Sequence, residues 1–122
     1  MISLVNITMY SRPLRQKLVD SNVTTRHLNK NVANYYNTFV QVNGEVISVE
    51  EDSSLGATFS IVHVMDENGN DIIALYPATT GDLLDGDYAT VIGAPITNFS
   101  FENVGGGYTN ATLIGASLVV AD

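Results

Sequence analysis

The chain has 122 residues, 45% of them hydrophobic, which is enough for one domain with a buried core and too few for two ordinary domains. It has no cysteine, so disulfides, thiolate nucleophiles and cysteine-ligated metals are excluded. No stretch approaches the roughly 20 apolar residues of a membrane-spanning helix, so membrane attachment would need a segment outside this sequence.

Charge divides the chain into two parts. All five basic residues lie in the first 30 positions, where Asp20 alone opposes them. The remaining positions, 31–122, hold twelve carboxylate side chains and no lysine or arginine. We therefore expect a basic N-terminal segment, residues 1–35, that packs on an acidic domain, residues 36–122. The basic residues are Arg12, Arg15, Lys17, Arg26 and Lys30.

The N-terminal segment is predicted to be helical or mixed. Ser11 before Pro13 is a favourable helix start, because proline is tolerated in a first turn, where its missing N–H would be unpaired. A second start lies at Ser21 or Thr24. The apolar residues that follow it at helical spacing are Leu28, Val32 and Tyr35 or Tyr36. The segment 1–10 alternates weakly, and an edge strand is the alternative there.

The segment 39–51 is predicted to be one long strand whose inward face changes partway along. Its apolar residues fall in one phase in the first half and in the other phase in the second half. They are Val40, Val42 and Val46, and then Ile47 and Val49. Because strand side chains alternate with period two, the change predicts a β-bulge. A bent strand of this kind, with Gly44 inside it, can serve both sheets of a small closed barrel.

A hairpin is predicted next. Residues 57–65 should form a strand that is buried on both faces. Its two faces are Phe59, Ile61, His63 and Met65, and Val62 and Val64. Asn68-Gly69 is a strong hairpin signal, because both residues tolerate the positive φ angles of a type I′ turn. Residues 72–76 are therefore the antiparallel partner, and Pro77 ends it.

Two further strands complete the expected fold. Residues 78–86 form a connector with room for at most a short helical turn. A fourth strand should run over residues 88–101 with a kink at Gly93 and Pro95. Glycines 105–107 should then form a turn. The closing strand should cover residues 108–120 and bend at Gly115. The predicted class is therefore all-β, with five strands and a short helical N-terminal segment.

Two short segments carry a resemblance to a known family. YNTFVQVNGEVISVEED contains the pattern V-x-V-x-G-x-V, and LLDGDYATVIGAPI contains L-x-x-G-D-Y-x-T-V-x-G. Together they resemble OB-fold domains of the tRNA-anti-like group, which includes small extracytoplasmic proteins of Gram-positive bacteria. The resemblance covers residues 36–121. It implies a five-stranded OB-fold barrel, a bacterial extracytoplasmic setting, and relatives that mostly lack a defined enzymatic role.

The sequence carries no convincing catalytic or metal site, so we expect no enzyme, metal or cofactor. It has no nucleophile elbow, P-loop or dinucleotide fingerprint. His63 lies on an apolar strand, where a core or interface histidine with one hydrogen bond is a simpler interpretation than a general base. Oxygen ligands occur at Asp66, Asn68, Asn70 and Asp71, but the segment lacks the glycine and glutamate of a calcium loop, which favours an ordinary hairpin.

The leading interpretation is a non-enzymatic OB-fold module that binds a protein or peptide partner through a barrel face or a sheet edge. Nucleic acid is not the expected ligand, because the barrel offers no lysine or arginine to phosphates. The candidate contact residues are Tyr76, Tyr88, Phe99 and Tyr108. Each of these aromatic residues has an alternative place in the core.

Two alternatives stay open. The first is an acidic inhibitor, such as a phage encodes, that imitates nucleic acid and occupies a basic groove of its partner. It requires carboxylates that gather on one exposed face, whereas scattered carboxylates would serve solubility. The second is a small hydrolase or divalent-dependent enzyme, which would require a pocket with carboxylates that converge on His63.

Overall fold

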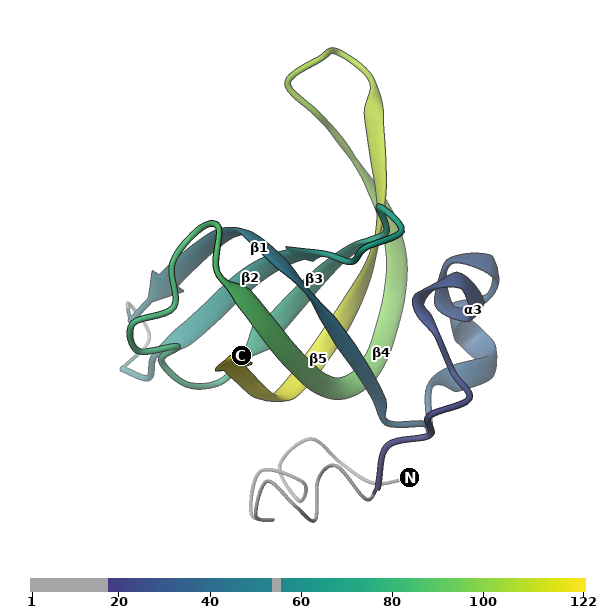
Figure 1. Cartoon of the computed structure of the whole chain (residues 1–122), viewed down its shortest axis with the longest axis horizontal. Coiled ribbons are helices and arrows are strands. Elements are labelled where there is room, and N and C mark those ends of the chain that lie inside the picture. Colours follow the sequence, from purple (N-terminus) through teal and green to yellow (C-terminus); the bar gives the residue numbers. More distant parts are fainter. Residues whose placement is uncertain (1–17, 54–55) are drawn as a thin grey trace.

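The computed structural model describes residues 18–53 and 56–122, and its main feature is one five-stranded sheet that closes into a ring (Figure 1). The strands are β1 (Val40–Asp52), β2 (Phe59–Met65), β3 (Asp71–Tyr76), β4 (Tyr88–Glu102) and β5 (Tyr108–Ala121). They are ordered β1-β2-β3-β5-β4, and β4 pairs back with β1. All neighbours are antiparallel except β3 and β5, which are parallel. The mostly-β class and the five predicted strands are confirmed.

β1 serves two neighbours, and its predicted bulge is confirmed. The strand pairs with β4 over residues 40–45 and with β2 over residues 45–52. The β1–β2 register shifts between Val46 and Ser48, so Ile47 is the inserted residue. Val46 is buried before the bulge, and Val49 packs against the core after it. The prediction that Ile47 faces inward is wrong: this register gives it no cross-strand partner, and its side chain is exposed.

Two glycines lie where strands pass closest to one another. A Cβ at Gly44 would lie 2.3 Å from the carbonyl oxygen of Met65, and a Cβ at Gly93 would lie 2.2 Å from that of Gly115. Both distances are far below van der Waals contact, so only glycine fits. The predicted kink in β4 is present as register shifts beside Gly93 and Pro95, and the strand continues through them.

The β2–β3 hairpin forms at the predicted place, but its turn is not type I′. Gly69 has a φ angle of 80°, and no described residue other than glycine has a positive φ. The amide of Gly69 donates to the carbonyl of Asp66 at 3.1 Å, and the Asp66 carboxylate accepts the amides of Asn68 and Asn70 at 3.0 and 2.9 Å. The aspartate thus stabilises a three-residue loop in which glycine alone takes the left-handed conformation.

The β4–β5 hairpin repeats this turn. The side-chain oxygen of Asn103 accepts the amides of Gly105 and Gly107 at 3.0 and 3.2 Å, and Gly106 has a φ angle of 83°. Asn103 therefore replaces Asp66, and Gly106 replaces Gly69. The same solution closes the β2–β3 and β4–β5 hairpins.

The tip of the β4–β5 hairpin extends beyond the ring. β1 pairs with β4 only as far as Gly93, and β3 pairs with β5 only from Ala111. Residues 98–110 therefore form a two-stranded arm, which Figure 1 shows projecting away from the other strands. We call residues 98–110 the β4–β5 arm.

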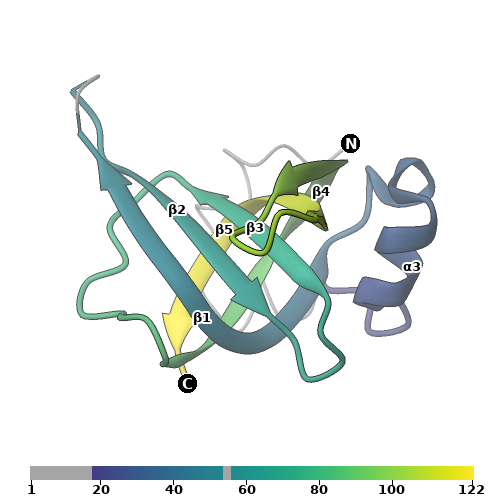
Figure 2. The ribbon, with the colours of Figure 1, turned by 90° about the horizontal axis from the view of Figure 1, so that it is seen from above.

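A short helix closes one side of the ring. α3 (Thr25–Lys30) is followed by the 3₁₀ turn η1 (Val32–Tyr35), and Thr24 is its N-cap, as one of the two predicted starts requires. Figure 2 shows α3 beside the ring, where α3 contacts β4 and β5 and η1 contacts β4. Leu28 of α3 is fully buried in the core. The strand or helix predicted before residue 18 lies outside the described residues.

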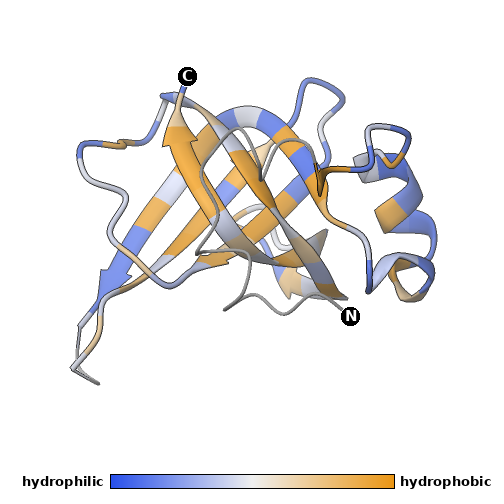
Figure 3. Cartoon of the chain, turned by 90° about the horizontal axis from the view of Figure 1, so that it is seen from below, coloured by the Kyte–Doolittle hydropathy of each residue, from blue (hydrophilic) through white to orange (hydrophobic). Residues whose placement is uncertain are grey.

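The inside of the ring is the core. Hydrophobic and hydrophilic residues alternate along much of the strands (Figure 3), and inward positions are filled mainly by valine and isoleucine. The prediction that residues 57–65 are buried on both faces is wrong. Ser60, Val62 and Val64 are fully buried, but Phe59, Ile61 and Met65 on the outward face are exposed. None of the described helices is long and apolar enough to cross a membrane.

The connector between β3 and β4 is held by a carboxylate of β1. Residues 77–87 contain turns and no helix. Glu51 accepts hydrogen bonds from the Thr79 hydroxyl at 2.8 Å, the Thr80 amide at 3.0 Å and the Thr80 hydroxyl at 3.2 Å. The Thr80 amide and the Thr79 hydroxyl hold the pKa of Glu51 below its ordinary value of 4.5.

Candidate functional site

Three large apolar side chains of β2 project from the outside of the ring. Phe59, Ile61 and Met65 are 44%, 39% and 37% exposed. They alternate with buried residues, so they share the outer face of the strand. Single exposed apolar residues are normal, but several on one strand mark a candidate interaction surface. We call Phe59, Ile61 and Met65 the apolar row.

The apolar surface continues across two more strands. The register places Ile73 of β3 opposite His63 and Leu75 opposite Ile61, and it places Leu113 of β5 opposite Ile73. Ile73, Leu75 and Leu113 are half-buried. Residues that stand directly opposite one another point to the same face of a sheet. The outer face of β2, β3 and β5 is therefore apolar over three neighbouring strands.

His63 joins this face to the β4–β5 arm. Its Nε2 donates a hydrogen bond to the Asp71 carboxylate at 2.6 Å. Its ring lies edge-on to the ring of Phe101, with centroids 6.0 Å apart, and Phe101 packs beside Phe99 at 5.8 Å. His63 is thus held by one carboxylate and one aromatic ring. No other carboxylate hydrogen-bonds to it among the described residues, so the carboxylates that a hydrolase would gather around it are not seen there.

A row of carboxylates runs beside the apolar row. On β1, Glu45 stands opposite Met65, Glu50 opposite Ile61 and Asp52 opposite Phe59. All three carboxylates are exposed. Side chains directly opposite each other on an antiparallel pair have Cβ atoms about 5 Å apart. We call Glu45, Glu50 and Asp52 the acidic row.

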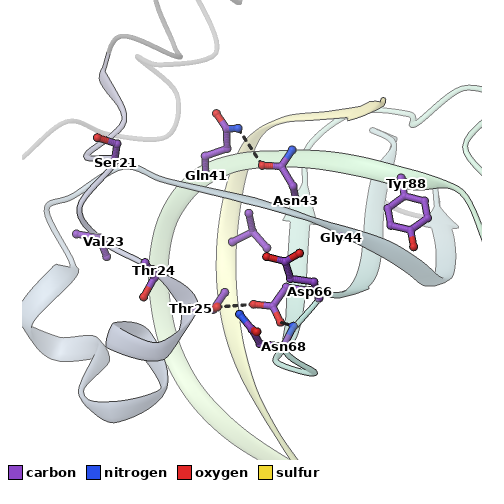
Figure 4. A pocket seen from close by; sticks show the side chains of 12 residues that line it. Ser21, Val23, Thr24, Thr25, Gln41, Asn43, Gly44, Asp66, Asn68 and Tyr88 are labelled. Atoms are coloured by element: carbon purple, nitrogen blue, oxygen red, sulfur yellow. Dashed lines mark hydrogen bonds between the residues drawn. The ribbon is translucent and has the colours of Figure 1, made fainter.

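A cleft of about 480 Å³ lies along the first half of β1 (Figure 4). It is bounded by the segment before α3, by β1, by the β2–β3 turn and by Tyr88. The Gln41 amide donates to Asn43 at 2.9 Å, and Asn43 donates to the Thr90 hydroxyl at 2.6 Å, which fixes the polar wall that β1 provides. Tyr88 contributes an exposed aromatic ring.

Asp66 in this cleft is occupied by structural hydrogen bonds. Burial raises the pKa of its carboxyl group, but hydrogen bonds from Thr25, Asn70 and Asn68 outweigh burial, so the pKa lies below its ordinary value of 3.8. Among the described residues, no group of three histidine or carboxylate side chains is arranged to hold a metal ion. The cleft is therefore a less specific candidate than the apolar row.

The four aromatic residues predicted to contact a partner lie in separate places. Tyr76 is half-buried and packs against the core, whereas Tyr88 lines the cleft and is 62% exposed. Phe99 and Tyr108 both lie on the β4–β5 arm. Phe99 stands opposite Ala111 and Tyr108 opposite Glu102, which puts the two aromatic rings on opposite faces of the arm. Phe99 reaches the apolar face through Phe101, and Tyr88 stands opposite Glu45 on β1.

The apolar row was not among the predicted contact residues, because both faces of the strand 57–65 are apolar. The usable signal lies on the neighbouring strand. Once the register of 39–51 against 57–65 is fixed, Glu50 and Asp52 fall opposite Ile61 and Phe59, and two carboxylates on one face indicate that this face is exposed.

No known protein family matches the chain, and no curated protein is significantly similar to it.

Proposed function

We propose that residues 36–121 form an OB-fold domain. Three features support this assignment. The strand order is β1-β2-β3-β5-β4 with a parallel β3–β5 pair, the long first strand bends at a bulge and pairs with two neighbours, and two segments resemble the tRNA-anti-like group. A small closed five-stranded sheet of this kind positions side chains on its outer face and leaves its interior to the core.

In this proposal the protein is a non-enzymatic module that binds a protein or peptide partner. The apolar row carries the proposal. Phe59, Ile61 and Met65 are exposed together in a chain that is otherwise strongly acidic, and half-buried apolar side chains extend the surface across β3 and β5. Apolar centres with polar rims are typical of protein interfaces. Nucleic acid fits this face poorly, because the strands contain no lysine or arginine to contact phosphates.

The test compares an apolar-row variant with a matched surface variant. Ile61→Ser/Met65→Ser removes two members of the row, and Leu84→Ser/Val104→Ser removes two exposed apolar residues of the connector and the arm. A partner is captured from cells of the source organism on the wild-type protein, purified, and titrated calorimetrically against all three proteins. We expect the row variant to lose at least tenfold in affinity and the surface variant less than twofold.

The titration also reports the nature of the interface. Binding through an apolar face should give a negative heat-capacity change. A partner that binds the row variant as tightly as the wild type would contradict the proposal. Turnover of a substrate by this chain at the apolar row would contradict the non-enzymatic part of the proposal.

The second candidate, a nucleic-acid mimic, makes a different prediction about salt. Its support is the large number of carboxylates, which lie on β1, in the 66–67 turn, in the connector and on the arm. This spread over the surface favours it less than one gathered face would. A mimic should lose affinity steeply as salt rises from about 50 to about 300 mM, whereas a mainly apolar interface should change little.

A further inference from the structure

The apolar row and the acidic row are parallel and adjacent. Each carboxylate of the acidic row stands directly opposite one member of the apolar row, in the pairs Glu45–Met65, Glu50–Ile61 and Asp52–Phe59. The strands that carry them contain no lysine or arginine. The one ion pair among the described residues is His63 with Asp71. His63 lies on the same outer face of β2, between Ile61 and Met65, and its partner Asp71 is on β3, on the side of β2 away from the acidic row. Glu45 and Glu50 therefore face no lysine or arginine on the sheet.

We propose that this double row binds a cationic amphipathic segment of a protein partner. Apolar side chains of the segment contact the apolar row, and lysine or arginine side chains beside them face the acidic row. This inference rests on the proposed function, and it adds the chemistry of the partner. Charge complementarity selects such a segment over a neutral or acidic one, because like charges placed opposite each other are unfavourable.

The geometry limits the length of the segment. From Phe59 to Met65 the strand advances six residues, which is about 20 Å at the rise of a β-strand. An extended segment of about seven residues, or about 13 residues of helix, spans this distance. Both conformations can present apolar and basic side chains on adjacent stripes.

One end of the double row offers a second recognition element. Glu45 stands opposite Met65 on β2 and opposite Tyr88 on β4. A basic side chain that approaches Glu45 therefore also meets the exposed ring of Tyr88. A carboxylate beside an aromatic ring is a favourable site for a guanidinium or ammonium group. The Glu45 end should therefore discriminate basic side chains more strongly than the Asp52 end.

A second copy of this chain is a poorer occupant. A symmetric contact would bring two acidic rows together, and the strands provide no basic residue to face them. Among the described residues the basic side chains are Arg26 and Lys30 of α3, a helix whose main contacts with the strands are to β4 and β5. Dimerisation through this face would overturn the proposal, and sedimentation at increasing protein concentration tests for it.

The binding test uses two synthetic ten-residue peptides with a fluorescent label. Both have leucine at alternating positions, and the remaining positions are lysine in one peptide and glutamine in the other. Binding is followed by fluorescence anisotropy at about 50 and about 300 mM salt. We expect the lysine peptide to bind at least tenfold more tightly than the glutamine peptide at the lower salt concentration.

A matched pair of variants separates a specific site from general attraction. Glu45→Gln/Glu50→Gln neutralises two members of the acidic row, and Asp82→Asn/Asp85→Asn removes the same charge from the exposed connector. We expect the first variant to lose at least fivefold in affinity for the lysine peptide and the second less than twofold. Tyr88→Ala should weaken binding of the lysine peptide by about threefold and leave the glutamine peptide unaffected.

Each other outcome overturns the proposal. Equal losses in the two charge variants would mean that only net charge matters, and failure of the lysine peptide to bind would remove the cationic segment altogether. The proposed function can stand when this inference fails. If Ile61→Ser/Met65→Ser abolishes capture of the native partner while Glu45→Gln/Glu50→Gln has no effect, the apolar interface stands and the cationic chemistry of the partner does not.

Discussion

The hydroxyl of Thr25 donates a hydrogen bond to the carboxylate of Asp66 at 2.5 Å, across 41 residues of sequence. The same carboxylate accepts the amides of Asn68 and Asn70, and Asn29 of α3 donates to the side chain of Asn70 at 2.8 Å. One carboxylate therefore shapes the β2–β3 turn and fastens the short helix to it. The helix has only six residues and could not persist without such contacts.

Replacing Asp66 should destabilise both the turn and the helix contact. We expect Asp66→Ala to lower the free energy of unfolding by about 1–3 kcal/mol, because it leaves a buried hydroxyl and two amides without their acceptor. Chemical denaturation measures the change. Glu67→Gln, in the same turn and exposed, is the matched control and should change stability by less than about 0.5 kcal/mol. Equal stability of the two variants would contradict this account.

The pH dependence of stability should carry the signature of Asp66. Its pKa in the folded state lies below the ordinary 3.8, so its contribution is fully present above that value and is lost as pH falls through the folded pKa. The difference in unfolding free energy between the wild type and Asp66→Asn should therefore be constant above about pH 5 and should shrink below about pH 4. A difference that grows on acidification would show that the sign is wrong.

Acidification should also loosen the connector, by protonating Glu51. Because its pKa is lowered from 4.5, acidification below that value should protonate it and release Thr79 and Thr80. Amide hydrogen exchange of Thr80 should accelerate as pH falls, after correction for the intrinsic exchange rate, and in Glu51→Gln it should already be fast at neutral pH. Glu50→Gln, whose carboxylate points to the opposite side of β1, is the control and should leave Thr80 protected.

Gly44 should tolerate no side chain. A Cβ there would lie 2.3 Å from a backbone oxygen of β2 and 2.8 Å from Val64 Cγ1, so Gly44→Ala must push two strands apart. We expect it to lower the free energy of unfolding by about 1–3 kcal/mol. Gly105→Ala is the control, since its added Cβ would approach only the Asn103 side chain, at 3.4 Å. A melting temperature unchanged by Gly44→Ala would refute the close approach of β1 to β2.

Truncation of a side chain should destabilise the protein much more on the inner face of β2 than on its outer face. Val62 is fully buried, so Val62→Ala should lower the free energy of unfolding by about 2 kcal/mol through lost transfer energy and a cavity. Ile61→Ala on the outer face should change it by less than about 0.5 kcal/mol. If Ile61→Ala proves as damaging as Val62→Ala, the outer face is covered in solution, and the proposed interaction surface is not free.

Much of the sheet could be predicted from local patterns. The change of apolar phase between Val46 and Val49 predicts the bulge, and Asn68-Gly69 predicts the β2–β3 hairpin. These features depend on residues close in sequence. The turn type was wrong because the side chain of Asp66 competes with the local preference of Asn68 for positive φ.

The candidate site depends on contacts that the sequence does not display. Whether the outer face of β2 is covered depends on which segment packs there, and α3 packs on another part of the ring. The acidic row becomes visible only once the register of β1 against β2 is fixed, because the bulge at Ile47 determines which carboxylates share a face with Ile61. The alternation of apolar and polar residues along one strand does not give that register, because the bulge shifts the pairing by one residue.

The parallel pairing of β3 with β5 has a consequence for synthesis on the ribosome. Asp71 pairs with Ala111, so the ring lacks a closing member until the segment as far as Ala121 has emerged. Before then, a nascent β1–β2–β3 meander would expose an unpaired edge on β3 and part of its apolar core, the features that make folding intermediates prone to aggregate. Slow codons downstream of β3 should therefore prolong the lifetime of this incomplete intermediate, because β1–β3 is not a unit that can fold to completion alone.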